Sequence, residues 1–281
     1  MKRKSLLKKC LATATAAILA LGALTACGGD DYNGYASAYN KVTANGGMEA
    51  KFDVDLTMDG EKVESTGDFK LDTSGSNNIL YYEMSTDDND IVQFSDGEYI
   101  YTDMDGIKSK YKLDSKPSSG NSSKEEQKVS SGTFNTNAFL NEFSSFLEAG
   151  KIKELGLLSP IEKAAVSSIK KDGDTYNLTF SEALVKKYLN TLVQNETGKD
   201  ADETIQIDEL NDFTYSATEK NGMLTGVTYK GTLVVNVPGS LMSDGNDATY
   251  DLDMNINIEF VNPGESVSID LPSTDGYDEV K

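Results

Sequence analysis

The segment Leu24-Thr25-Ala26-Cys27 is the part of the sequence with the clearest capacity for chemistry. Its cysteine follows small residues and an apolar run that extends from Cys10 to about Leu24. The basic residues of this region all come before that run: Lys2, Arg3, Lys4, Lys8 and Lys9. A charged region, an apolar region and a small-residue cleavage site, in this order, are typical of an export signal. Cleavage before Cys27 would place its thiol on a new N-terminal residue, where it can be acylated.

The segment closely resembles the lipobox of bacterial lipoprotein signal peptides. The resemblance implies that residues 1–26 are removed, that Cys27 is lipidated, and that the chain is anchored on the extracytoplasmic face of a cell membrane, with a Gram-positive source favoured. Two alternatives stay open, a secreted product cleaved elsewhere and a retained membrane span. The span is disfavoured because roughly fifteen apolar residues fall short of the about twenty that a bilayer requires.

Residue types that most enzymes need are absent from the sequence. It contains no histidine and two cysteines, Cys10 in the leader and Cys27 at the cleavage site. The part after Cys27 therefore has no disulfide and no catalytic thiol. Without histidine it lacks the usual general base, the Ser-His-acid triad and the commonest transition-metal ligand. No phosphate-binding or dinucleotide-binding loop is present either. We expect a non-enzymatic protein with no cofactor and no metal.

The net charge of −20 narrows the range of partners. Such an excess of acids opposes binding to nucleic acid and to anionic lipid headgroups, so the acyl chains must provide the membrane contact. Calcium prefers carboxylate oxygens, but no acidic cluster has the spacing of an EF-hand loop, and solvated turns are the simpler interpretation. The clusters are Asp87, Asp88 and Asp90; Asp103 and Asp105; Asp200, Asp202 and Glu203; Asp244 and Asp247.

The sequence predicts a fold built mainly from long strands. Apolar residues occupy the even positions from Met48 to Met58 and again from Tyr250 to Phe260, and polar residues occupy the odd positions between them. Because alternate residues of a strand point to opposite faces, each strand has one apolar face and one solvated face. Turn dipeptides that favour tight hairpins separate further plausible strands: Asp59-Gly60, Asp96-Gly97, Asp105-Gly106, Asp172-Gly173 and Asn221-Gly222. The pattern predicts an antiparallel meander in one continuous sheet.

Amphipathic helices are the predicted cover for the apolar face of this sheet. We expect a short helix near 35–43, and two more over 137–149 and over 181–192, the last of them capped by Ser181. Residues 27–34 read as a flexible tether, 115–132 as a polar loop, and 273–281 as a tail. Tyr81, Tyr82, Tyr99 and Tyr101 alternate in strands and form either a binding face for glycan or peptide, or ordinary half-buried strand positions.

This order of elements resembles the LolA/LolB and LppX/LprG superfamily of envelope lipoproteins over residues 35–272. The local similarities are the opening strand 49–59 and the ending 264–272, since members of the group close with a short strand and a proline. The resemblance implies an α+β fold, a single large curved antiparallel sheet shaped like a half-barrel, with a few helices covering its concave apolar face. It also implies a function, the binding of a lipid or other amphiphile in that face. The alternative is a structural lipoprotein with a fully packed core whose surface binds an envelope protein or wall polymer.

Overall fold

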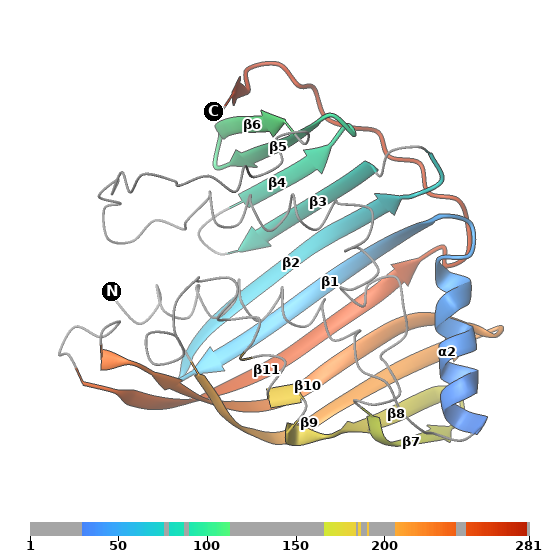
Figure 1. Ribbon diagram of the computed structural model, residues 1–281, viewed down its shortest axis with the longest axis vertical. Coiled ribbons are helices and arrows are strands. Elements are labelled where there is room, and N and C mark those ends of the chain that lie inside the picture. The colour runs from blue at the N-terminus through green and yellow to red at the C-terminus, as the bar shows by residue number, and fades with distance from the viewer. Residues whose placement is uncertain are drawn as a thin grey trace, which may run out of the picture.

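The computed structural model describes residues 30–75, 79–86, 90–112, 166–183, 185–186, 190, 206–239 and 246–279. This part of the chain contains one helix with defined bounds, α2 (Asp30–Val42), and twelve strands in a single sheet (Figure 1). The strands are β1 (Gly47–Met58), β2 (Glu61–Asp72), β3 (Ile79–Thr86), β4 (Asp90–Ser95), β5 (Tyr99–Met104), β6 (Ile107–Lys112), β7 (Val166–Asp172), β8 (Thr175–Phe180), β9 (Gln206–Lys220), β10 (Met223–Val237), β11 (Ala248–Val261) and β12 (Asp278–Glu279).

The strand order is β12-β6-β5-β4-β3-β2-β1-β11-β10-β9-β8-β7, and all neighbours are antiparallel except β12 and β6. Strands β1 and β11 join the two halves of the chain through a continuous ladder that runs from Glu49 opposite Val261 to Met58 opposite Leu252. The sheet is open, with β12 and β7 at its two edges. The predicted single antiparallel sheet is thus confirmed, and the described part of the fold is mostly β.

Tight turns explain why consecutive strands pair. The dipeptides Asp59-Gly60, Asp105-Gly106 and Asn221-Gly222 have positive φ at both residues, as type I′ hairpin turns require. At the β7–β8 turn only Gly173 has positive φ, as expected for the first central residue of a type II′ turn. The loop after Asp96-Gly97 is longer, because the β4–β5 ladder ends at Ser95 opposite Ile100. All five predicted hairpin positions therefore connect paired strands.

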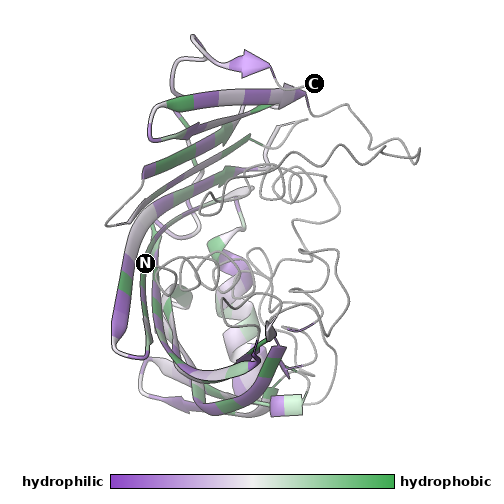
Figure 2. Ribbon diagram, turned by 90° about the vertical axis from the view of Figure 1, so that its left-hand side faces the viewer, coloured by the Kyte–Doolittle hydropathy of each residue, from purple (hydrophilic) through white to green (hydrophobic). Residues whose placement is uncertain are grey.

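The two faces of the sheet differ in chemistry. The face that carries Val54, Ile256 and Tyr229 is buried; α2 packs against it, and the sheet bends around this side in Figure 2, so we call it the concave face. The opposite, outer face carries the polar positions of β1 and β11. There Lys70 pairs with Glu49 across neighbouring strands, and the Thr232 hydroxyl donates to Asp253. The alternation of the two long strands therefore predicted the faces correctly.

Two regions differ from the predicted boundaries. The helix α2 begins at Asp30, so it takes in the end of the predicted tether. Residues 266–274 are irregular, and the closing strand is instead β12, within the predicted tail. The helix expected after Ser181 does begin there, since the Val185 N–H donates to the Ser181 carbonyl at 3.0 Å. The helix predicted over 137–149 and the loop predicted over 115–132 lie outside the described residues.

Candidate ligand-binding face

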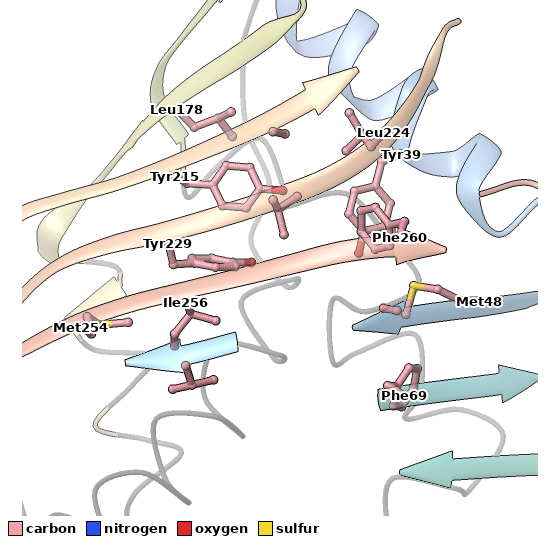
Figure 3. Close-up of a cluster of buried hydrophobic side chains, with 14 of the residues drawn as sticks. Tyr39, Met48, Phe69, Leu178, Tyr215, Leu224, Tyr229, Met254, Ile256 and Phe260 are labelled. Carbon is pink, nitrogen blue, oxygen red and sulfur yellow. The ribbon is translucent and has the colours of Figure 1, made fainter. Parts of the chain in front are cut away.

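The middle of the concave face is apolar across several strands. Val54 of β1 lies opposite Ile256 of β11, and Leu56 lies opposite both Met254 of β11 and Val63 of β2. All five side chains are buried. Figure 3 shows how the neighbouring side chains of β9, β10 and β11 gather on this side of the sheet. Burial of such side chains contributes about 1.5–3 kcal/mol each, so this face supplies the core of the fold.

A tyrosine cluster occupies the concave face beneath α2. Tyr35 of the helix is fully buried and meets the rings of Tyr39, Tyr176 and Tyr215 edge to face, with ring centroids 5.9–6.2 Å apart. The hydroxyl oxygens of Tyr35 and Tyr215 lie 3.0 Å apart and share a hydrogen bond. Tyr39, about one turn further along the helix, packs on Phe260, as Figure 3 shows. Rings at helical spacing thus fasten α2 to β8, β9 and β11.

Burial keeps these hydroxyls protonated. It raises the pKa of Tyr39, Tyr215 and Tyr229 well above the ordinary value, and the neighbouring tyrosines raise the pKa further. The cluster is therefore uncharged at neutral pH, and its hydroxyls can donate hydrogen bonds.

An ion pair of the sheet lies beside the first turn of α2, and Asp31 of the helix bonds to the same strand. The Lys171 ammonium lies 2.8 Å from the Glu219 carboxylate, which also accepts a 2.6 Å hydrogen bond from the Tyr176 hydroxyl. The hydrogen bond from Lys171 lowers the pKa of Glu219 most, and the one from Tyr176 lowers it further. The hydrogen bonds of Lys171 with Glu219 and Tyr176 raise the pKa of Lys171. Asp31 of α2 accepts the backbone N–H of Lys171. A Cβ atom at Gly34 would lie 2.8 Å from the Tyr176 hydroxyl, so any larger residue here would require the Tyr176 side chain to shift.

One cross-strand row of the concave face becomes polar on β4, β5 and β6, between apolar rows. Gln93 and Thr102 lie opposite each other, are 0% and 1% exposed, and are joined by a 3.0 Å hydrogen bond from the Gln93 amide to the Thr102 hydroxyl. Ser109 of β6 continues the same row. Among the described residues, the Gln93 Oε1 atom and the Ser65 hydroxyl are buried and have no hydrogen-bond partner. Such groups cost about 1–3 kcal/mol each when left unpaired.

The outer face carries its own aromatic cluster at this end of the sheet. Phe94 and Tyr101 are cross-strand neighbours with stacked rings 4.8 Å apart, and Tyr277 from the C-terminal segment meets both rings edge to face. Tyr81 and Tyr99 pack against this cluster, whereas Tyr82 belongs to the core of the concave face. The four tyrosines predicted as one face are therefore divided between two faces.

The Asp96 carboxylate orders the loop beside this cluster. Burial alone would raise the pKa of Asp96, but hydrogen bonds from the Tyr99 and Glu98 N–H groups and the Tyr101 hydroxyl outweigh it and lower the pKa. The described acidic residues of the clusters act in the same structural way. Asp103 and Asp105 accept backbone N–H groups of their hairpin and of Asp90, and Asp247 accepts the Gly239 N–H.

No group of three or more acidic or cysteine side chains among the described residues is arranged to hold a metal ion. Asp87, Asp88, Asp200, Asp202, Glu203 and Asp244 lie outside the described residues, as does Cys27, so its lipidation stays a prediction. The described part of the chain contains no helix with the length and hydropathy that a membrane crossing needs.

Gln93 was not predictable from the sequence, because the apolar residues of β4 suggest the opposite orientation of the strand. In Ile91-Val92-Gln93-Phe94-Ser95, the apolar Val92 and Phe94 share one side and suggest that Gln93 faces solvent. The register places Gln93 on the concave face instead, opposite Tyr82, and Phe94 on the outer face. The aromatic Tyr277, far along the chain, covers Phe94 and makes this reversed phase stable.

Comparison with known proteins gives distant structural similarity only. No protein-family model and no curated protein matches the chain. A DUF1329 family protein from Desulfovibrio piger is 10% identical, with 85% of this chain and 95% of that chain covered and a TM-score of 0.27. A LolA superfamily protein from Nitrosomonas europaea is 8% identical, with 89% and 96% covered and a TM-score of 0.24. The chain is thus distantly similar in structure to LolA superfamily and DUF1329 proteins.

Proposed function

We propose that this protein is a non-enzymatic, membrane-anchored envelope lipoprotein that holds a lipid or other amphiphile against the concave face of its sheet. The signal-like leader and Cys27 support the anchor. The single observation that supports binding is the composition of the concave face, where continuous apolar rows adjoin buried polar groups that the described chain leaves unpaired. A face built only for stability would not retain such groups, because apolar residues of similar shape cost less.

Native mass spectrometry of the full chain, released from its own membrane, tests ligand binding. We expect a noncovalent adduct with the mass of an amphiphile, in addition to the covalent mass of the anchor. A matched variant, Leu56→Arg, places a charge in the middle of the concave face and should remove the adduct, whereas Thr228→Arg on the outer face should retain it. A wild-type protein without adduct, whose concave face is filled by its own side chains, would overturn the proposal.

Metabolic labelling with palmitate tests the anchor. Replacement of Cys27 by alanine removes the thiol that would be acylated, so labelling and membrane retention should be lost. Cys10→Ala is the matched control, because Cys10 is the other cysteine and belongs to the leader. Continued labelling of the Cys27→Ala variant would refute the anchor at this position.

A second candidate function rests on the outer face of β5 and β6. Three lysines, Lys108, Lys110 and Lys112, alternate along β6 in a chain of net charge −20, and the Lys110 ammonium lies 5.1 Å from the centre of the Tyr99 ring. Lysine beside aromatic rings suits an anionic wall polymer or an acidic protein. A photo-crosslinking residue at Tyr99 should capture one specific partner in cells, and the same residue at Thr228 should not. Capture of the same neighbours at both positions would exclude this function.

A further inference from the structure

Gln93 lies at the junction of an apolar row and a polar row. Cross-strand pairing forms one continuous line over the concave face from β11 to β6: Phe260, Ala50, Phe69, Tyr82, Gln93, Thr102 and Ser109. Four residues of this line are apolar or aromatic, and the last three are polar and uncharged. Since neighbouring strands lie about 4.8 Å apart, the part from β11 to Gln93 is about 19 Å long.

The carboxamide of Gln93 retains one unpaired end in either orientation. When its Nε2 atom donates to Thr102, the acceptor Oε1 is left without a partner among the described residues. When the amide is turned over, Oε1 accepts from the Thr102 hydroxyl and the two N–H groups of Nε2 are left instead. The side chain is 0% exposed, so bulk solvent does not supply the missing partner, and no described residue supplies it either.

Among the described residues, the groups that surround Gln93 offer no counter-charge to a charged partner. The flanking rows place Ile91, Met104 and Ile100 beside the Gln93–Thr102 pair, and Ser95 uses its hydroxyl to accept the Gly97 N–H. The lysines of β6 cannot supply a positive counter-charge at Gln93, because Lys108 and Lys110 lie on the outer face, opposite Asp103 and Tyr101. A carboxylate or phosphate at Gln93 would lose its hydration without gaining a counter-charge.

We propose that the Gln93–Thr102 pair binds the uncharged, hydrogen-bonding head group of an amphiphile, a hydroxyl or carboxamide, whose apolar chain lies along the row toward β11. This inference rests on the proposed function and assigns its ligand class. The ligand hydroxyl donates to Gln93 Oε1, and the Thr102 hydroxyl, which accepts from Gln93, retains a proton that it can donate to the ligand. Half-buried Ser109 continues the polar end of the row on β6, where Asp278 of the edge strand β12 lies opposite it.

Three probes with the same ten-carbon chain test the head group: 1-decanol, 1-methoxydecane and decanoate. Their binding to the full chain in phosphatidylcholine vesicles is measured by equilibrium dialysis, with protein-free vesicles subtracted. The methyl ether lacks the hydroxyl proton, and decanoate adds the charge. We expect wild-type protein to bind 1-decanol about tenfold more tightly than 1-methoxydecane, which is the effect of one lost hydrogen bond that leaves a buried acceptor unpaired. Decanoate should bind more weakly than either uncharged probe.

Variants of similar shape locate the preference. Gln93→Met and Thr102→Val should each remove most of the tenfold preference for 1-decanol. Thr228→Val is the matched control, because Thr228 donates a comparable hydrogen bond to Asn257 on the outer face, and it should keep the preference. If Gln93→Met and Thr102→Val both retain the wild-type preference, or if decanoate binds best, the assignment to this pair is wrong.

The outcomes separate this inference from the proposed function. If wild-type protein binds none of the three probes, the function as an amphiphile carrier fails. If it binds 1-decanol and 1-methoxydecane equally well, and Leu56→Arg abolishes both, carriage by the concave face stands and only the head-group inference is overturned.

Discussion

Each end of the sheet carries an aromatic cluster, and the two clusters lie on opposite faces. At the β8–β11 end, the N-terminal helix α2 brings Tyr35 and Tyr39 onto the concave face, where the hydroxyls of Tyr35 and Tyr215 pair. At the β4–β6 end, the C-terminal segment brings Tyr277 onto the outer face, and the concave face keeps the partly paired Gln93. Burial alone therefore does not complete a core. The two ends differ in hydrogen-bond pairing, which is complete between Tyr35 and Tyr215 and incomplete at Gln93.

The largest expected effect tests whether α2 is essential to its end of the sheet. Tyr35→Ala removes a fully buried ring with several edge-to-face neighbours, so we expect a loss of about 3–5 kcal/mol in the free energy of unfolding. Urea denaturation measures it. Ser37→Ala, on the exposed side of the same helix, should change stability by less than about 0.5 kcal/mol. Equal effects of the two changes would show that the helix is not fastened by its tyrosines.

The second prediction concerns the aromatic cluster at the other end. Tyr277→Ala exposes Phe94 and Tyr101, and we expect a loss of about 2 kcal/mol, less than for Tyr35 because Tyr277 is at the surface of its cluster. The same urea titration measures the loss, with the neighbouring Glu279→Ala as control. Because Tyr277 lies on the outer face, probe binding to the concave face should stay unchanged. A loss of binding would show that the two faces are coupled.

The third prediction compares a paired and an unpaired polar group directly. Tyr35→Phe leaves the buried Tyr215 hydroxyl without its partner, so stability should fall by about 1 kcal/mol. The double change Gln93→Met with Thr102→Val replaces both members of a pair that is already unpaired in part and leaves no buried partner behind, so stability should stay the same or rise. Parallel urea titrations of both variants check the contrast. If both variants lose similar stability, Gln93 is a satisfied structural residue and the comparison between the two ends fails.

The smallest expected effect is the pH dependence of the ion pair at the start of α2. The folded state lowers the pKa of Glu219, so the pair stabilises the fold above the pKa of the unfolded state and loses this effect as the pH falls through the folded-state value. Glu219→Gln should therefore cost less than about 1 kcal/mol near pH 7 and little at about pH 3. Urea midpoints at both pH values measure it, with the exposed Glu209→Gln on the same strand as control. A difference that persists at low pH would assign the effect to packing.

Much of the fold follows from local patterns. The alternation over 48–58 and 250–260 predicted which side chains are buried, because the strand repeat of two residues needs no knowledge of the partner strands. The Asp-Gly and Asn-Gly turns predicted the hairpins, because positive φ at both positions suits the twist of the strands. The pairing of β1 with β11 and the position of β12 were not predictable in this way, because each joins segments far apart in the chain.

The candidate site shows the same division. The sequence alone predicted a sheet with one apolar face and one solvated face, in a protein without histidine. It also predicted the thiol of Cys27 as the site of the anchor. Only the tertiary structure placed Phe94 on the outer face and Gln93 on the concave face, since strand β4 has apolar residues on both sides and its phase is set by its neighbours Tyr82, Thr102 and the distant Tyr277. Period and turn chemistry are local properties that a sequence determines by itself. Register, and with it the choice of which polar group is left unpaired, depends on contacts between distant strands.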